Sequence, residues 1–218
     1  SLGNVTDPNE LADRFGVDSL RYFLLRDFTF GQDGSYSAEA IVNRANAELA
    51  NSFGNLAQRT LSLIFKNCEG VLPPILKQTD EDLALFALVE RTIAQEMSAA
   101  VEQLAFSQAL ESWMGAVFAC NAYIDAQAPW ALKKTDLERM RTVLATLYIV
   151  IAELAVAVSP VMPGSMARLL EAMGVPESLR SFEGIRTTWY SPLAEAHYTL
   201  AQPVGLFPRL EMPESEAA

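Results

Sequence analysis

The chain has 218 residues, of which half are hydrophobic and a fifth are charged. This composition is typical of a soluble globular protein and excludes a disordered chain. The formal net charge is −11 at pH 7, and a field of that sign repels phosphate, which excludes a protein that binds nucleic acid mainly by non-specific attraction.

Residues 1–34 are predicted to form two short helices and a loop. The sequence Asp-Pro-Asn-Glu at residues 7–10 supplies a capping residue, a proline at the first helical position and an acid in the first turn. That helix should stop at Gly16, and a second helix should open at residues 18–19. The stretch DFTFGQDGSYS, with its glycines and aspartates, predicts an ordered loop.

A long helix is predicted over residues 38–65, with Ser37 as its cap. Its apolar residues repeat at steps of three and four, which is typical of one buried face. The members of this stripe are Ile41, Ala45, Leu49, Phe53, Leu56, Thr60 and Leu63 or Ile64. A polar ridge borders the stripe and consists of Arg44, Glu48, Asn51, Asn55 and Arg59.

Three further long helices follow a linker at residues 69–78. The first starts at residues 79–82, with predicted core positions Phe86, Ile93, Met97, Val101 and Leu104. The second covers residues 107–126 with Leu110, Trp113, Val117, Cys120 and Ile124 inward. Thr135 and Glu138 form a capping box that opens the third, with core positions Leu137, Met140, Leu144, Leu147, Ile151, Leu154 and Val158.

Long amphipathic helices joined by short links, without a fixed repeat, predict an all-α antiparallel helical bundle. We expect the bundle to cover residues 35–211, with a shorter helix after Pro163, an extended C-terminal tail from residue 176 packed on the bundle, and a disordered end at residues 212–218. The apolar run at residues 143–158 is a turn short of a membrane span and carries Glu153, so we interpret it as a buried central helix and expect no membrane association.

The two cysteines, Cys68 and Cys120, are far apart and show no metal-ligand spacing. We interpret them as reduced thiols of a cytoplasmic protein and predict no metal site. The sequence also shows no nucleophile–base pair and no glycine-rich phosphate loop, so a binding surface is a better hypothesis than an active site.

The polar ridge and the segment NAYIDAQAPWALKK are the two candidates for such a surface. A solvated ridge needs no function, but four asparagines within thirteen residues are unusual because asparagine is a poor helix former. Pro129 places Trp130 at a helix corner, where the indole either plugs the core or presents a flat face. Lys133, Lys134, Arg139 and Arg141 form the densest basic cluster of the chain. Aromatic faces beside basic residues hold unstacked RNA bases.

These residues resemble the bacterial methionyl-tRNA synthetases. The resemblance covers the chain to about Glu211, and it is carried by SLGNV, RFGVDSLRYFLLRDFTFGQDGSYS, NRANAELANSFGNLAQR, NAYIDAQAPW and GLFPRLE. The Pro-Trp block occurs in related synthetases as well, whereas Gly-Gln-Asp-Gly, Gly-Asn-Leu-Ala-x-Arg and Leu-Phe-Pro-Arg together favour methionine.

The resemblance implies a helical anticodon-binding domain in the C-terminal part of an enzyme that attaches methionine to its tRNA with ATP and Mg²⁺. It assigns anticodon contacts to Asn55, Arg59 and Trp130, and Asn51, Pro129, Lys133 and Lys134 are candidates for supporting contacts. Ser1 would be the last residue of the catalytic signature loop, and residues 1–34 would link the two parts. The catalytic motifs and any zinc-binding insertion are missing, so we expect no catalytic residue and no cofactor in this chain itself.

The expected partners are the CAU anticodon of methionine tRNA and the catalytic domain of the same chain, in a monomeric enzyme. Two alternatives remain at this point. One is a non-catalytic helical module that binds a protein, in which the indole would be packed inward. The other is the anticodon-binding domain of an isoleucyl-, valyl- or leucyl-type synthetase.

Overall fold

The structure is a computed structural model that describes residues 7–32, 34, 36–183, 198–203 and 205–212. The described residues fold as an all-α protein, as predicted. The helical elements, including π-helical stretches η1 and η2 and a 3₁₀ turn η3, are α1 (Pro8–Phe15), α2 (Val17–Asp27), α3 (Ala38–Arg44), η1 (Ala45–Gly54), α4 (Asn55–Asn67), α5 (Asp80–Arg91), η2 (Thr92–Met97), α6 (Ser98–Glu102), α7 (Phe106–Gln127), α8 (Pro129–Thr135), α9 (Leu137–Val158), α10 (Pro163–Ala172) and η3 (Glu177–Leu179).

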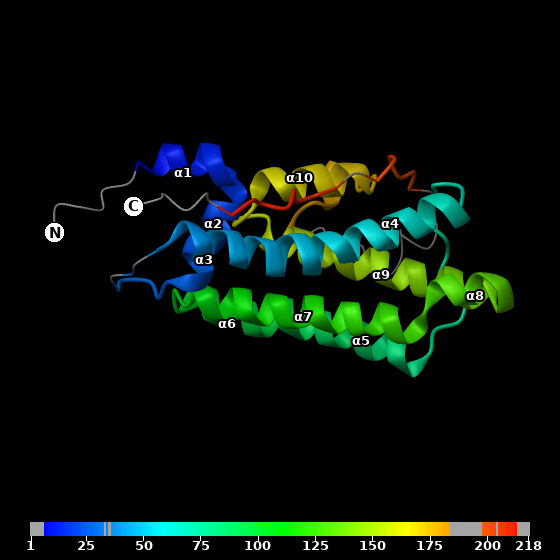
Figure 1. Ribbon diagram of the computed structural model, residues 1–218. Helices are drawn as coiled ribbons and strands as arrows, with labels where there is room; N and C mark the ends of the chain where they lie inside the picture. Colours follow the sequence, from blue (N-terminus) through cyan, green and yellow to red (C-terminus); the bar gives the residue numbers. More distant parts are fainter. Residues whose placement is uncertain (1–6, 33, 35, 184–197, 204, 213–218) are drawn as a thin grey trace.

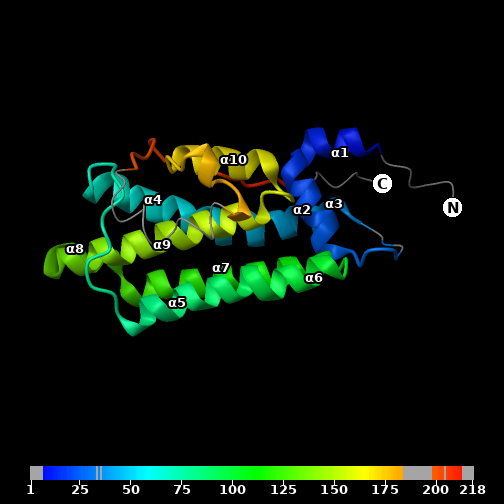
Figure 2. The ribbon, with the colours of Figure 1, turned by 180° about the vertical axis from the view of Figure 1, so that it is seen from behind.

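Four long helical rods form an elongated antiparallel bundle (Figure 1). The rod α3–η1–α4 runs toward the end where α8 lies, α5–η2–α6 runs back, α7 returns to α8, and α9 runs back again. The view from behind shows α10 lying over α9 and the α1–α2 pair at the end opposite α8 (Figure 2). Helix α8, which carries Trp130, therefore lies at one end of the bundle, the end where α4 also finishes.

The caps in the N-terminal half are those that the sequence predicts. The Asp7 side chain accepts a hydrogen bond from the Asn9 backbone N–H at 2.8 Å, and the Ser37 hydroxyl accepts one from the Ala40 N–H at 3.0 Å. Gly16 ends α1 with φ +83°, a left-handed conformation that glycine adopts without a steric cost. These local signals fix where the helices begin.

Helix α9 is the centre of the core. Within the described residues it is the one helix long and apolar enough to cross a membrane, yet 89% of its most apolar 18-residue stretch is buried inside the protein. Trp113 of α7 is fully buried against it, and its indole Nε1–H donates to the Leu154 carbonyl at 3.0 Å. The prediction of a buried central helix is confirmed.

The long helix widens into π-helical turns over η1. Ile41, Ala45, Leu49 and Phe53 are all buried although they are four residues apart, a spacing that would drift around an α-helix of 3.6 residues per turn. Wider turns keep this stripe on one face. The Ser52 hydroxyl donates to the Ala47 carbonyl, five residues earlier, at 2.8 Å.

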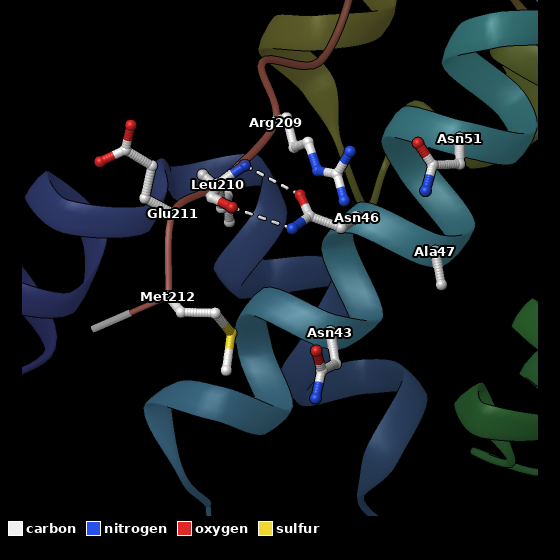
Figure 3. Close-up of a pocket in the computed structure, with 8 residues that line it drawn as sticks. All are labelled: Asn43, Asn46, Ala47, Asn51, Arg209, Leu210, Glu211 and Met212. Carbon is white, nitrogen blue, oxygen red and sulfur yellow. Dashed lines mark hydrogen bonds between the residues drawn. The ribbon is translucent and has the colours of Figure 1, made fainter. Parts of the chain in front are cut away.

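The described part of the C-terminal tail, residues 198–203 and 205–212, contacts the bundle. The Leu200 N–H donates to the Gly70 carbonyl at 2.7 Å, and an antiparallel bridge joins Val71 to Thr199. Further on, the Asn46 amide holds Leu210 by two hydrogen bonds, from its Nδ2 to the Leu210 carbonyl at 2.9 Å and from the Leu210 N–H to its Oδ1 at 2.8 Å (Figure 3). This pairing accounts for one of the four asparagines. Of the predicted disordered end, residues 213–218 lie outside the described residues.

Three predicted core positions and one predicted helix cap are wrong. Val101 and Leu104 are 46% and 49% exposed, because η2 turns the stripe and the rod ends at Glu102. Leu137 is likewise exposed. The cap of α9 is Asp136, whose carboxylate accepts from the Arg139 N–H at 2.9 Å, and Thr135 is the last residue of α8.

Candidate nucleic-acid interface

The corner at residues 127–130 is made by a left-handed residue followed by a proline. Ala128 is left-handed, with φ 44° and ψ 58°, and its N–H closes α7 on the Ile124 carbonyl. Pro129 then opens α8 at the first helical position and is buried. The corner turns Trp130 outward with 43% of its surface exposed, so the prediction of a corner tryptophan is confirmed and the indole is not a core plug.

Arg59 lies over the exposed indole. Its guanidinium carbon is 5.2 Å from the centre of the Trp130 ring, within the range of a cation–π contact. The Asp125 carboxylate of α7 holds the same guanidinium, with 2.7 Å between Arg59 Nη2 and Asp125 Oδ1. Arg59 and Asp125 keep 32% and 62% of their side-chain surface in solvent. We call Trp130, Arg59 and Asp125 the corner cluster.

Asn55 is exposed one turn before Arg59 on the same helix, as the four-residue spacing predicts. Gly54 precedes it at the end of η1. A Cβ at Gly54 would meet the Leu49 carbonyl oxygen at 2.8 Å and Phe207 of the tail at 3.5 Å. The glycine of the Gly-Asn-Leu-Ala-x-Arg motif therefore serves the widened turn and the packing of the tail, whereas the asparagine and the arginine face outward.

Two members of the predicted ridge, Arg44 and Glu48, differ from this exposed half. Glu48 is buried and accepts from the Tyr22 hydroxyl at 2.6 Å and from Arg44 Nη1 at 2.7 Å. Burial first, and then the Glu48 charge and hydrogen bond, raise the pKa of Tyr22. The ridge is thus a structural ion network at one end and an open polar surface at the other.

Asn51 is exposed and lines a surface pocket together with the tail (Figure 3). The pocket residues are Asn43, Asn46, Ala47, Asn51, Arg209, Leu210, Glu211 and Met212. Asn51 lies between this pocket and Asn55, four residues on.

The predicted basic cluster, like the ridge, contains both exposed and largely buried residues. Lys133 and Lys134 are exposed in the last turn of α8. Arg139 is not a surface cation, because its guanidinium donates to both oxygens of Asp82, at 2.5 and 2.7 Å, and only 14% of its side chain is exposed. The interpretation of Arg139 as part of an open basic cluster is wrong.

Asp82 is fully buried and collects four hydrogen bonds. Besides Arg139, the Tyr123 hydroxyl and the Thr79 N–H donate to it, the latter at 2.9 Å. Burial by itself would raise the pKa of Asp82, but the hydrogen bonds from Arg139, Tyr123 and Thr79 outweigh it and hold the pKa below its usual value. We call Asp82, Arg139, Tyr123, Thr79 and Gln127 the neck network, because it lies where α8 leaves the bundle.

Sequence reasoning missed the neck network, although Thr79 and Asp82 carry a visible signal. Their spacing is that of a capping box, and the structure contains both of its hydrogen bonds at the start of α5. The pairing of Asp82 with Arg139, 57 residues later, has no local signal. Ser1, the predicted signature-loop residue, lies outside the described residues. Within the described part, no group of three or more His, Cys, Asp or Glu side chains could hold a metal ion.

Comparison with known proteins gives matches along the whole chain. The family described as "Anticodon binding domain of methionyl tRNA ligase" matches residues 72–216, and the family described as "tRNA synthetases class I (M)" matches residues 1–61. A methionine–tRNA ligase of Mesorhizobium japonicum is 44% identical over 218 residues, and one of Brucella suis is 45% identical over 216. The matches span 100% and 96% of this chain but only 42% and 40% of those relatives.

Solved structures match the chain over a similar share of its length. The free form of Mycobacterium tuberculosis methionyl-tRNA synthetase superimposes with a TM-score of 0.88 at 38% identity, over 96% of this chain and 42% of that one. The same enzyme in complex with methionyl-adenylate gives a TM-score of 0.88 at 39% identity, over 95% and 40%. The chain spans about two fifths of the length of the proteins that it matches.

Proposed function

Since the chain belongs to the methionyl-tRNA synthetase family, we propose that it recognises the CAU anticodon of methionine tRNA for an enzyme that attaches methionine to that tRNA. Residues 72–216 match the anticodon-binding domain of that family. The observation that carries the proposal is the corner cluster, in which a 43% exposed indole lies against an arginine at the free end of the bundle. An indole packed inward, as a protein-interaction module requires, is not what the corner contains.

The roles follow from the chemistry of each side chain. The open face of Trp130 stacks on the first anticodon base, an interaction worth about 1–3 kcal/mol per base. Asn55 offers an amide with two donors and an acceptor, and Arg59 offers a donor fork, so both can hydrogen-bond to base edges. Because Arg59 already lies against the indole, a base on Trp130 comes within reach of its guanidinium.

The supporting contacts account for binding by an acidic protein. Lys133 and Lys134 are exposed on α8 and neutralise nearby phosphates. Pro129 fixes the start of α8 below Trp130, and Asn51 extends the row of exposed amides by one turn. With a net charge of −11, affinity depends on this local patch and on base contacts rather than on long-range attraction.

We infer that, in the longer relatives, a catalytic part outside the bundle carries out the reaction. ATP and Mg²⁺ act there, and residues 1–34, with Ser1 at the edge of the signature loop, connect it to the anticodon-binding bundle of residues 35–211. The enzyme acts in the cytoplasm as a monomer. We propose no cofactor for the bundle.

The test is a titration of the 218-residue chain with RNA hairpins at moderate salt. One hairpin carries a CAU loop, a second carries the same nucleotides scrambled, and others carry isoleucine, valine or leucine anticodons. We expect the CAU hairpin to bind at least tenfold more tightly than the others. Equal affinities for all loops would overturn the proposal, and a preference for a branched-aliphatic anticodon would assign the domain to a different specificity.

A second experiment separates anticodon recognition from the chemistry in a full-length enzyme that contains this chain. Trp130→Ala should lower the aminoacylation of methionine tRNA sharply and leave ATP–pyrophosphate exchange nearly unchanged. Equal loss of both activities, or of neither, would contradict the role of Trp130.

A further inference from the structure

Residues 128–136, which leave the bundle after α7, form α8 and return to α9, are called the α8 excursion here. We propose that Arg139 is a positioning residue that ties the start of this excursion to its end and thereby fixes Trp130 for anticodon binding; this inference rests on the proposed function. In this account Arg139 does not touch RNA. It acts through the backbone that leads into and out of α8.

Arg139 makes a hydrogen bond at each end of the α8 excursion. Its guanidinium Nη2 donates to Gln127 Oε1 at 2.7 Å, and Gln127 is the last residue of α7, three residues before Trp130. Its backbone N–H donates to Asp136 Oδ1 at 2.9 Å, and Asp136 is the residue that follows α8. One residue therefore joins the entry of the excursion to its exit.

Arg139 is itself held by a rigid support. The two oxygens of Asp82 accept from its Nη1 and Nη2 at 2.5 and 2.7 Å, and the Thr79 hydroxyl lies 3.2 Å from Nη2. Asp82 is fully buried. The Asp82 carboxylate also takes the Thr79 N–H and the Tyr123 hydroxyl, so the first turn of α5 and the last turns of α7 meet at one carboxylate. The neck network thus connects three helices below α8.

The excursion needs such a support because it has little stability of its own. Helix α8 has seven residues, and a helix of that length is not stable in isolation. It follows Ala128 in a left-handed conformation, which is unfavourable for a residue with a Cβ. Pro129 is buried and Leu132 packs partly against the core, whereas Trp130, Lys133 and Lys134 face solvent. The direction of the indole therefore depends on the two ends of the excursion as well as on the contacts of Pro129 and Leu132 and on Arg59.

Only arginine satisfies this geometry. Its planar fork reaches Asp82 with two nitrogens and directs one of them to Gln127 and Thr79 as well. A lysine at the same place supplies one ammonium group, which keeps the charge beside Asp82 but cannot make the paired contact and the bond to the neck together. Arg139→Lys therefore tests position without removing the charge.

The contrasting hypothesis is a phosphate contact, which the basic cluster in the sequence suggests. The two hypotheses differ in the expected effect of Arg139→Lys. A phosphate contact survives this substitution because lysine keeps the charge, so the affinity and the slope of log affinity against log salt, about 0.7 per contact for single strands, would both stay at their wild-type values. Loss of positioning lowers the affinity for the CAU hairpin and leaves that slope unchanged.

The experiment compares Arg139→Lys, Gln127→Ala and a control, Arg91→Gln, in the 218-residue chain. Gln127→Ala removes the bond to the neck while the Asp82–Arg139 pair stays intact. Arg91 lies on α5, is 57% exposed and pairs with Glu96, so it matches Arg139 in charge but not in place. Each chain is first melted to establish that it is folded, then titrated with the CAU and scrambled hairpins at several salt concentrations.

A second readout needs no RNA. The chain contains three tryptophans, so 5-fluorotryptophan gives three ¹⁹F resonances, and the Trp130 resonance is the one that Trp130→Phe removes. In Gln127→Ala and Arg139→Lys we expect this resonance to shift or broaden while the Trp113 resonance keeps its position. In Arg91→Gln all three resonances should stay where they are.

We expect Gln127→Ala and Arg139→Lys to bind the CAU hairpin about three- to tenfold more weakly than wild type with an unchanged salt slope. Wild-type affinity together with an unperturbed Trp130 resonance in folded Gln127→Ala would overturn the inference, as would wild-type affinity in Arg139→Lys, which is the result that a phosphate contact predicts because lysine keeps the charge. If the wild-type chain shows no preference for CAU, the proposed function fails, and the ¹⁹F readout still decides whether Arg139 positions Trp130.

Discussion

Two arginine–aspartate pairs lie near the α7–α8 corner. They have the same chemistry but differ in their exposure to solvent and in the number of other contacts that the arginine makes. Arg139 and Asp82 are 14% and 0% exposed, and the guanidinium of Arg139 bonds to Asp82, Gln127 and Thr79. Arg59 and Asp125 are 32% and 62% exposed, and Arg59 makes one ion pair and one ring contact.

The difference in burial distinguishes an arginine that supports the corner from one that can contact a ligand. The guanidinium of Arg139 is largely buried and is already bonded to three residues, whereas Arg59 keeps part of its guanidinium in solvent beside an exposed indole. The fully held pair defines where the corner lies, and the loosely held pair is free to exchange solvent for a base. Position in the fold, rather than residue type, therefore decides which basic residue meets RNA.

The largest effect is expected for Asp82→Asn. Removing one partner of a buried ion pair leaves the Arg139 charge uncompensated and costs about 3–5 kcal/mol of unfolding free energy. Urea denaturation at pH 7 measures it. A cost below about 1 kcal/mol would mean that the neck network stabilises the fold no more than a surface ion pair does.

The pH dependence of this cost has a definite sign. Because the folded pKa of Asp82 is lowered, its stabilising contribution is present above the unfolded value of about 3.9 and is lost as the pH falls through the folded pKa. The difference between wild type and Asp82→Asn should therefore shrink in acid, below about pH 4.

A partly buried carboxylate that has no ion pair among the described residues should behave in the opposite way. Burial first, and then the charge of Glu90, raise the pKa of Glu153 to about 8. The folded state keeps a proton that the unfolded state has lost, so stability should decrease as the pH rises from about 4.5 to 8, by at most about 1.4 kcal/mol per pH unit. Glu153→Gln should flatten this slope in denaturation series, and an unchanged slope would contradict the assignment.

The smallest effect is expected for Asp125→Asn, the substitution matched to Asp82→Asn. An exposed ion pair contributes about 0–1 kcal/mol, so the unfolding free energy should change by less than 1 kcal/mol. The same urea series measures both variants. Equal costs at Asp82 and Asp125 would remove the distinction between the neck network and the corner cluster.

Local patterns were sufficient to predict the helices, the caps at Asp7 and Ser37 and the corner at Trp130, but they left open whether the indole faces inward or outward. The four-residue spacing of Asn55 and Arg59 and the proline before Trp130 act within one or two turns, where sequence patterns are reliable. The buried centre of α9 was equally visible, because its apolar steps continue over the whole helix.

What could not be predicted depends on contacts between distant residues or on changes of helical pitch. The burial of Arg139 requires Asp82, 57 positions earlier, and no spacing rule connects them. The exposure of Val101 follows from the π-helical turns of η2, which α-helical periodicity does not anticipate. The use of Asn46 to hold Leu210 joins residues 164 positions apart.

The most direct test of the central claim is a double-mutant cycle between Trp130 and the first anticodon base. Affinities are measured for wild type and Trp130→Ala, each with a CAU hairpin and with one that lacks the base at the first position. If the indole stacks on that base, the two changes should be coupled by about 1–3 kcal/mol, because either one alone removes the same contact. Losses that add within about 0.5 kcal/mol would show that Trp130 does not hold this base, and would contradict the account of the corner as the anticodon-binding surface.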